Sequence, residues 1–151
     1  MTMLKDTPSP FDVLLVEDEL ADARLVGFAI RQSGIACTLH HVTDGHEALA
    51  FLKREAGRYD GVPQPDLILL DLNMPRMNGG EFLAAVKAQE NLASIPVVVL
   101  TTSAVERDVE HAYRLHASGY ITKPVDMDEF TTAMRHLLEY WRMLTRLPKK
   151  E

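Results

Sequence analysis

Five short apolar segments alternate along the chain with segments of helical periodicity, and this alternation restricts the fold more than any other feature. The apolar segments are DVLLVED, ACTLHHV, DLILLD, IPVVVLTTS and GYIT, at residues 12–18, 36–42, 66–71, 95–103 and 119–122. Several are apolar throughout, which is typical of parallel strands that are covered by helices on both faces. The sequence therefore predicts an α/β fold, a doubly wound (βα)5 sandwich with a five-stranded parallel sheet.

The predicted helices carry start and stop signals. Gly34 follows the first helical segment and would end it. Asp44 and Glu47 have the spacing of a capping box, which predicts a helix that opens there. Asp126 and Glu129 repeat this spacing before the last helix. That helix is expected to carry Phe130, Met134, Leu137, Trp141 and Leu144.

Length and composition indicate one globular domain. The chain has 151 residues, of which 46% are hydrophobic, so it can bury a sizeable core. We expect a flexible arm at residues 1–10, the domain at 11–141, and a helical extension with a tail at 142–151. The sequence shows no internal repeat and no second domain.

Charge and cysteine usage exclude several classes of partner. The net charge is −6 and no block of Lys or Arg occurs, which argues against nucleic acid. No apolar run approaches the roughly 20 residues of a membrane helix, and the start of the chain lacks the apolar core of a signal peptide. Cys37 is the single cysteine and cannot form an internal disulfide. These features predict a cytoplasmic protein without a membrane partner.

Polar side chains stand where four of the predicted strands end. Because ligands bind beyond the carboxyl ends of parallel strands, these residues would meet on one edge of the sheet. Clustered carboxylates repel one another unless a cation holds them, and hard oxygen ligands suit Mg²⁺. The Lys123 ammonium could pair with Asp71 or with a phosphoryl group on it, and the Thr101 hydroxyl could hydrogen-bond such a group. Together they form the set that an aspartyl phosphate requires. The residues are Glu17, Asp18, Asp71, Thr101, Thr102 and Lys123.

Each of these signals also has a purely structural explanation. An acidic pair after a strand often caps a helix, and a lone Asp at a strand end often starts a turn. A Lys-Pro pair is common in loops, and two threonines suit a strand. Their joint position on one edge of one fold favours the functional interpretation.

The segments VLLVEDE, LILLDLNMPRMNGGEFL, VVVLTTS and YITKP resemble the sequence blocks of response-regulator receiver domains. The resemblance covers residues 11–141, and it implies the flavodoxin-like form of the predicted sandwich. Thr101 lies 30 residues after Asp71 and Lys123 lies 52 after it, as in that family. The long loop REAGRYDGVPQP makes the chain most similar to stand-alone regulators that accompany bacterial and cyanobacterial phytochromes.

The resemblance assigns roles to individual residues. Asp71 would accept the phosphoryl group. Asp18 would bind Mg²⁺ directly, Glu17 would act through water or as an outer ligand, and Asn73 would contribute its backbone carbonyl.

The family's switch residues also have counterparts here. Thr101 would be the switch hydroxyl, Lys123 the ion-pair partner of the phosphoryl group, and Tyr120 the aromatic switch residue. Lys123–Pro124 would be a cis peptide bond. Two positions depart from the usual family pattern, because Glu17 replaces an Asp and Thr102 replaces a smaller residue.

The implied function is that of a single-domain response regulator in a two-component phosphorelay. It would accept a phosphoryl group from a sensor histidine kinase of the phytochrome type and signal by protein contact. It would not be an enzyme beyond its own Mg²⁺-dependent phosphorylation and dephosphorylation.

A homodimer through the fourth helix, fifth strand and fifth helix is one expected partnership. The C-terminal residues would either support such a dimer or cover the protein's own core. They are Tyr140, Trp141, Leu144 and Leu147.

Two other functions compete with this interpretation. A receiver-like module could bind partners without phosphorylation, but the complete set of site residues argues against it. An aspartate-nucleophile phosphohydrolase usually has a second acid two residues after the nucleophile, where this chain has Asn73. A nucleotide-binding domain is disfavoured because neither GxGxxG nor GxxxxGK[ST] follows a strand.

Overall fold

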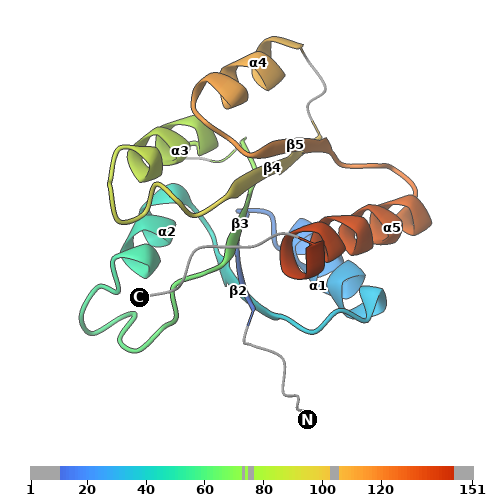
Figure 1. Ribbon diagram of the computed structural model, residues 1–151, viewed down its shortest axis with the longest axis horizontal. Helices are drawn as coiled ribbons and strands as arrows, with labels where there is room; N and C mark the ends of the chain where they lie inside the picture. The colour runs from blue at the N-terminus through green and yellow to red at the C-terminus, as the bar shows by residue number, and fades with distance from the viewer. Residues whose placement is uncertain (1–10, 73, 75–76, 103–105, 145–151) are drawn as a thin grey trace.

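The computed structural model describes residues 11–72, 74, 77–102 and 106–144, and over these residues the predicted sandwich is confirmed (Figure 1). Within this part of the chain, five parallel strands form one sheet in the order β2-β1-β3-β4-β5. The strands are β1 (Asp12–Val16), β2 (Thr38–Val42), β3 (Leu67–Leu70), β4 (Val97–Thr101) and β5 (Gly119–Thr122). The helices are α1 (Leu20–Ser33), α2 (Gly45–Leu52), α3 (Gly79–Lys87), α4 (Glu106–Arg114) and α5 (Met127–Leu138), which continues as the π-helical turn η1 (Glu139–Leu144).

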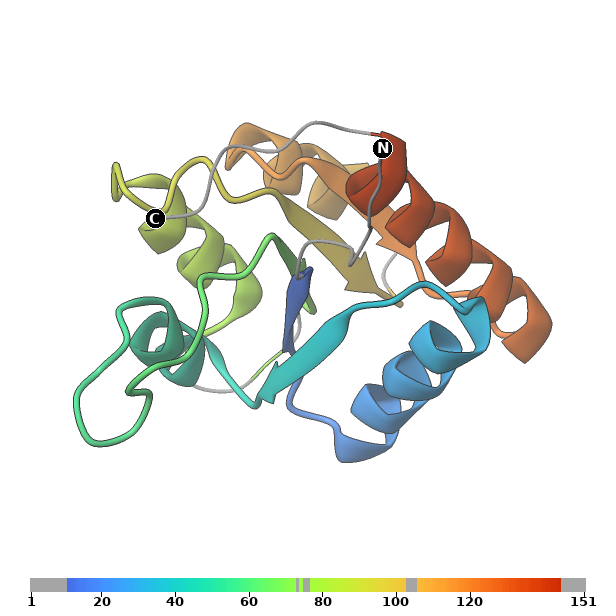
Figure 2. The same ribbon diagram turned by 60° about the horizontal axis from the view of Figure 1, so that its bottom comes forward.

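Two helical layers enclose the sheet. Helices α1 and α5 cover one face, and α2, α3 and α4 cover the other (Figure 2). Successive residues of a strand point to opposite faces, so both sets of side chains are buried. In β1, Leu14 contributes to the core under α2 and α3, whereas Leu15 contributes to the core under α1 and α5. Double coverage therefore explains why the central strands are apolar throughout.

The helix caps differ in part from the predicted ones. Asp44 caps α2 by accepting a hydrogen bond from the Glu47 N–H at 2.9 Å, but the Glu47 carboxylate accepts from the Tyr59 hydroxyl at 2.6 Å. Asp126 precedes α5 without a side-chain cap hydrogen bond, so the capping box predicted there is wrong. Asp126 is exposed, and water can satisfy the amides of an exposed first turn.

A complete capping box opens α3, where the sequence was not interpreted in this way. The Asn78 Oδ1 atom accepts from the Glu81 N–H at 2.9 Å, and the Asn78 N–H donates to Glu81 Oε1 at 3.1 Å. This cap lies in the segment that links Asp71 to α3, so it fixes the start of that helix.

The C-terminal turn contributes to the core through one aromatic side chain. Trp141 packs against the core under α1 and α5 and meets Tyr140 edge-on, with 5.0 Å between ring centroids. The Arg142 guanidinium lies 5.3 Å from the centroid of the Phe11 ring. Tyr140 and Met143 are exposed. The extension therefore covers the core through Trp141 and leaves other apolar side chains outside; Leu147 lies beyond the described residues.

No helix in the described residues is long and apolar enough to cross a membrane.

Candidate functional site

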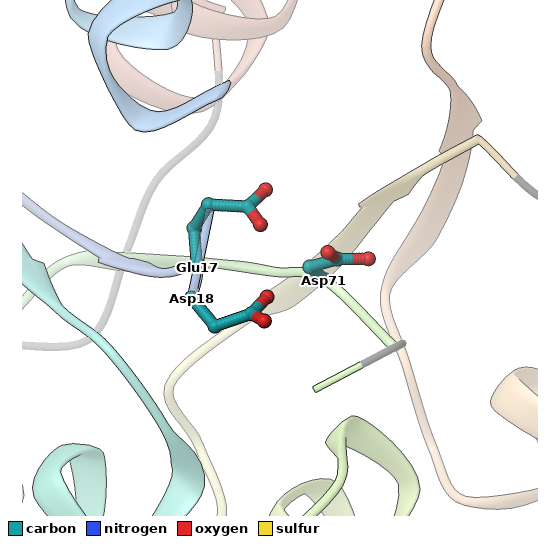
Figure 3. A group of neighbouring side chains, drawn as sticks. All are labelled: Glu17, Asp18 and Asp71. Atoms are coloured by element: carbon teal, nitrogen blue, oxygen red, sulfur yellow. The ribbon is translucent and has the colours of Figure 1, made fainter. Parts of the chain in front are cut away.

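Three carboxylates converge at the carboxyl ends of the neighbouring strands β1 and β3. Val16 and Leu70 are paired in the sheet and end these strands, so the residues that follow emerge side by side. The side chains of Glu17, Asp18 and Asp71 point into one space (Figure 3), and one carboxylate oxygen from each lies within 4.8 Å of the others. The predicted grouping of these residues is thus present in the structure.

The burial of this cluster demands a positive charge. Glu17 is 1% exposed and Asp71 is also buried, whereas Asp18 is exposed. Burial raises the pKa of Glu17 to about 7; the hydrogen bond from Lys123 opposes this shift, and the neighbouring Asp71 adds to it. Burial is the main cause of this raised pKa, and a cation bound beside the carboxylate would oppose it.

This donor set fits Mg²⁺. All three groups offer hard carboxylate oxygens, and the exposure of Asp18 leaves room for the waters that Mg²⁺ retains. The fourth predicted ligand, Asn73, lies outside the described residues.

Lys123 lies beside the cluster, where the charge of Asp71 acts on it and its hydrogen bonds go to two other acids. Its Nζ atom donates to Glu17 Oε1 at 2.8 Å and to Asp22 Oδ2 at 3.3 Å. Burial alone would lower the pKa of Lys123, but the hydrogen bond to Glu17 and the charges of Glu17, Asp71 and Asp22 outweigh burial and raise it. The ammonium therefore stays charged and is available to a further anion in the site.

The sequence interpretation missed Asp22. It lies in the first turn of α1, where an acid is also favoured by the helix dipole. The available signal was a further acid one turn after Glu17, Asp18 and Glu19, which places it near the same edge of the sheet.

The predicted cis bond between Lys123 and Pro124 is wrong, because no cis peptide occurs among the described residues. The trans isomer of an X–Pro bond is favoured by about 0.5–1 kcal/mol unless its surroundings impose the other. With the trans bond, the Lys123 N–H donates to the Thr101 carbonyl at 2.7 Å and the ammonium still reaches Glu17.

Thr101 supplies a buried hydroxyl without a partner. It ends β4, is 0% exposed, and its Oγ1 atom has no hydrogen-bond partner in the described part of the chain. A buried hydroxyl left unpaired costs about 1–3 kcal/mol. An acceptor such as a phosphoryl oxygen that reached this hydroxyl would remove that cost.

Two neighbours predicted from the family are placed nearby. Thr102 is exposed and lines a cavity with Lys123. Tyr120 lies in β5, pairs with Val99 of β4, and packs half-buried against the core under α2 and α3. Its role as a switch stays a prediction.

Gly79 is a second feature that the sequence interpretation did not identify. A Cβ atom there would lie 2.6 Å from the carbonyl oxygen of Asp71 and 2.6 Å from the Cα atom of Leu72. The Gly79 N–H also donates to the Leu72 carbonyl at 3.2 Å. The start of α3 is thus packed directly against the backbone that carries Asp71, and only glycine leaves room for this approach.

Comparison with known proteins places this geometry in a family context. Residues 13–135 match the family model of the response regulator receiver domain. The chain is 41% identical to Response regulator Rcp1 of Synechocystis sp. over 97% of this chain and 99% of that protein.

Solved structures agree with this likeness. The phosphorylated cyanobacterial phytochrome response regulator RcpA matches 93% of this chain and 100% of its own, with a TM-score of 0.86 and 41% identity. The Mn²⁺-bound form of Rcp1 matches the same shares, with a TM-score of 0.84 and 42% identity.

Proposed function

The chain belongs to the response regulator receiver family, and from this we propose that it accepts a phosphoryl group on Asp71 from a phosphohistidine of a sensor histidine kinase. The observation that carries the proposal is the convergence of three carboxylates within 4.8 Å beside the partly buried ammonium of Lys123. Burying like charges together is costly, and a bound cation would offset this cost. The relatives of this chain include phytochrome response regulators, so we assign the phosphoryl donor to the phytochrome type of histidine kinase.

The residues suited to hold Mg²⁺ are Asp18 and Asp71 directly, Glu17 through water, and the backbone carbonyl of Asn73. When bound, the metal would neutralise charge on the phosphoryl oxygens. The Mn²⁺-bound structure of Rcp1 concerns that protein, and it supports the proposal that this chain also binds a divalent cation.

In the proposed reaction, a carboxylate oxygen of Asp71 attacks the phosphorus atom of the phosphohistidine. The new O–P bond forms as the N–P bond breaks, and the electron pair of that bond returns to the imidazole nitrogen. Lys123 pairs with the negative oxygens of the transferred group, and the Thr101 hydroxyl donates to one of them. Positioning and charge stabilisation account for most of the catalysis in such transfers.

The proposed output is a change of contact surface. A phosphoryl acceptor for the buried Thr101 hydroxyl would bias a two-state equilibrium that involves Thr101 and Tyr120. We assign the phosphoryl transfer to the cytoplasm. The role of the protein would be signalling and not turnover of a separate substrate.

A homodimer through α4, β5 and α5 is the proposed partnership of this surface. Tyr113 on α4 is exposed, as are Tyr140 and Met143 after α5, and exposed aromatic side chains favour interfaces. Removing the residues after Tyr140 tests the contribution of the extension. We expect a lower mass in solution by light scattering; an unchanged dimer would exclude the extension from the interface.

Asp71→Asn tests the phosphoacceptor. With acetyl phosphate and Mg²⁺, the wild type should incorporate one phosphoryl group by mass spectrometry, and the variant should incorporate none. Asp128→Asn, an exposed carboxylate in α5, is the matched control and should behave as wild type. Incorporation of phosphate into the Asp71→Asn variant would reject this assignment. A phosphotransfer profile against purified histidine kinases would then test the phytochrome-type donor.

A further inference from the structure

The Lys123 ammonium is held by two carboxylates of different character. The contact with Glu17 is short, at 2.8 Å, and the Glu17 side chain is 1% exposed. The contact with Asp22 is longer, at 3.3 Å, and the Asp22 side chain is 38% exposed. One contact therefore lies inside the site, while the other crosses its rim to α1.

The space beside Asp22 allows its carboxylate to separate from the Lys123 ammonium. Both Asp22 and Lys123 line a cavity of about 210 Å³ between α1, the segment after β5 and the start of α5. Water can enter beside the half-exposed carboxylate and replace the ammonium as its partner. Breaking this contact therefore leaves no charge buried without a partner, whereas breaking the contact with Glu17 would leave the Glu17 carboxylate buried and unpaired by the ammonium.

We propose that Asp22 is a positioning residue that tethers Lys123 in the resting state and competes with the phosphoryl group on Asp71 for the ammonium. This inference rests on the proposed function of Asp71. The described contacts of Asp22 include Lys123 and not Asp71, so Asp22 acts through Lys123.

The competition concerns the position of the ammonium and not the number of its donors. An ammonium has three N–H donors, and Glu17 and Asp22 use two of them, so a phosphoryl group could bind the third but would pull the ammonium away from its present position. A phosphoryl group brings about two negative charges and three acceptor oxygens, so it draws the ammonium toward Asp71. The contact that yields is the longer and more exposed one. Asp22 therefore opposes the phosphorylated state and shortens its lifetime.

Asp22→Ala, Asp22→Glu and Glu19→Ala test the tether. Glu19 precedes the same helix, is exposed, and makes no side-chain cap hydrogen bond, so its removal changes the charge to the same extent without touching Lys123. The probe is beryllofluoride with Mg²⁺, a mimic of the phosphoryl group, and its dissociation constant is measured for each protein. The rate constant for loss of phosphate from Asp71 is the second readout.

For Asp22→Ala we expect about two- to fivefold tighter binding of beryllofluoride and a similarly slower loss of phosphate, the size expected for a partly exposed ion pair. Asp22→Glu should return both values to those of the wild type, and Glu19→Ala should change them less than Asp22→Ala does. Circular dichroism checks that each variant is folded.

Equal shifts in Asp22→Ala and Glu19→Ala would overturn the tether, because the general field of the charge would then explain both. No shift in Asp22→Ala, or the same shift in Asp22→Glu, would overturn it as well. If the wild type takes up no phosphate and binds no beryllofluoride, the proposed function of Asp71 fails. If both occur and the variants do not differ, only the tether fails.

Discussion

Gly79→Ala tests the contact between α3 and the backbone that carries Asp71. The added methyl group would lie 2.6 Å from the Asp71 carbonyl oxygen and from the Leu72 Cα atom, where ordinary contact begins at 3.4 Å. Both neighbouring atoms are backbone, so no side-chain rotation relieves the clash. The start of α3 and the end of β3 must separate by about 0.8 Å.

The magnitude follows from two opposing effects. Overpacking of this kind costs about 1–3 kcal/mol, whereas alanine in place of glycine in a helix gains about 0.5–1 kcal/mol. We expect a net loss of up to about 2.5 kcal/mol in the free energy of unfolding. The same displacement moves Asp71 relative to Glu17 and Asp18. A misplacement near 1 Å can slow a positioned reaction by about 10²-fold, so we expect phosphorylation to slow by at least about tenfold.

Gly80→Ala is the matched control. The nearest atom to its added Cβ is Asn78 Oδ1 at 3.4 Å, with the next at 3.7 Å. Urea unfolding in the presence of a chelator gives the stability, and the initial rate of phosphorylation by acetyl phosphate with Mg²⁺ gives the function. Gly80→Ala should be neutral or slightly stabilising and should react at the wild-type rate. If Gly79→Ala is as stable and as reactive as Gly80→Ala, the close approach does not position Asp71.

Three further predictions concern stability and pH. Lys87→Met should lower the free energy of unfolding by about 1–3 kcal/mol in urea titrations, because the Lys87 ammonium donates to two backbone carbonyls before β4 at 2.9 and 2.7 Å; unchanged stability would contradict this. Asn78→Ala should cost about 1 kcal/mol by thermal unfolding because the α3 capping box is lost, and Asn78→Asp should retain most of it. Glu17 has a folded pKa of about 7, above its ordinary 4.5, so the folded state binds its proton more tightly. Without metal, stability should therefore fall as pH rises from about 4.5 to about 7, and less so in Glu17→Gln; an equal slope in both proteins would reject this.

The sequence determined the sheet and the composition of the site. Apolar runs such as LILL at 67–70 can be buried on both faces only in a covered parallel sheet, and this constraint is local to each run. Glu17, Asp71 and Thr101 stand at or directly after strand ends in the sequence itself. Parallel strands place those ends on one edge, so their grouping followed from topology without any knowledge of side-chain conformation.

The partners of individual atoms were decided only by the tertiary structure. Lys123 could pair with any of several acids on this edge, and only the folded chain shows that it bonds Glu17 and Asp22. The spacing of a capping box occurs at Asp126 and at Asn78, yet only Asn78 forms one, because a cap depends on where the incoming backbone directs the side chain.

Gly79 shows the same division. A glycine at the first position of a helix indicates a start or a turn, but its function here depends on the backbone of Asp71 and Leu72 lying 2.6 Å from where its Cβ would be. Local sequence sets which residues can form strands and which charges lie at their ends. The distances that turn those charges into a site depend on how α1, α3 and the segment after β5 pack together, and packing is a property of the whole molecule.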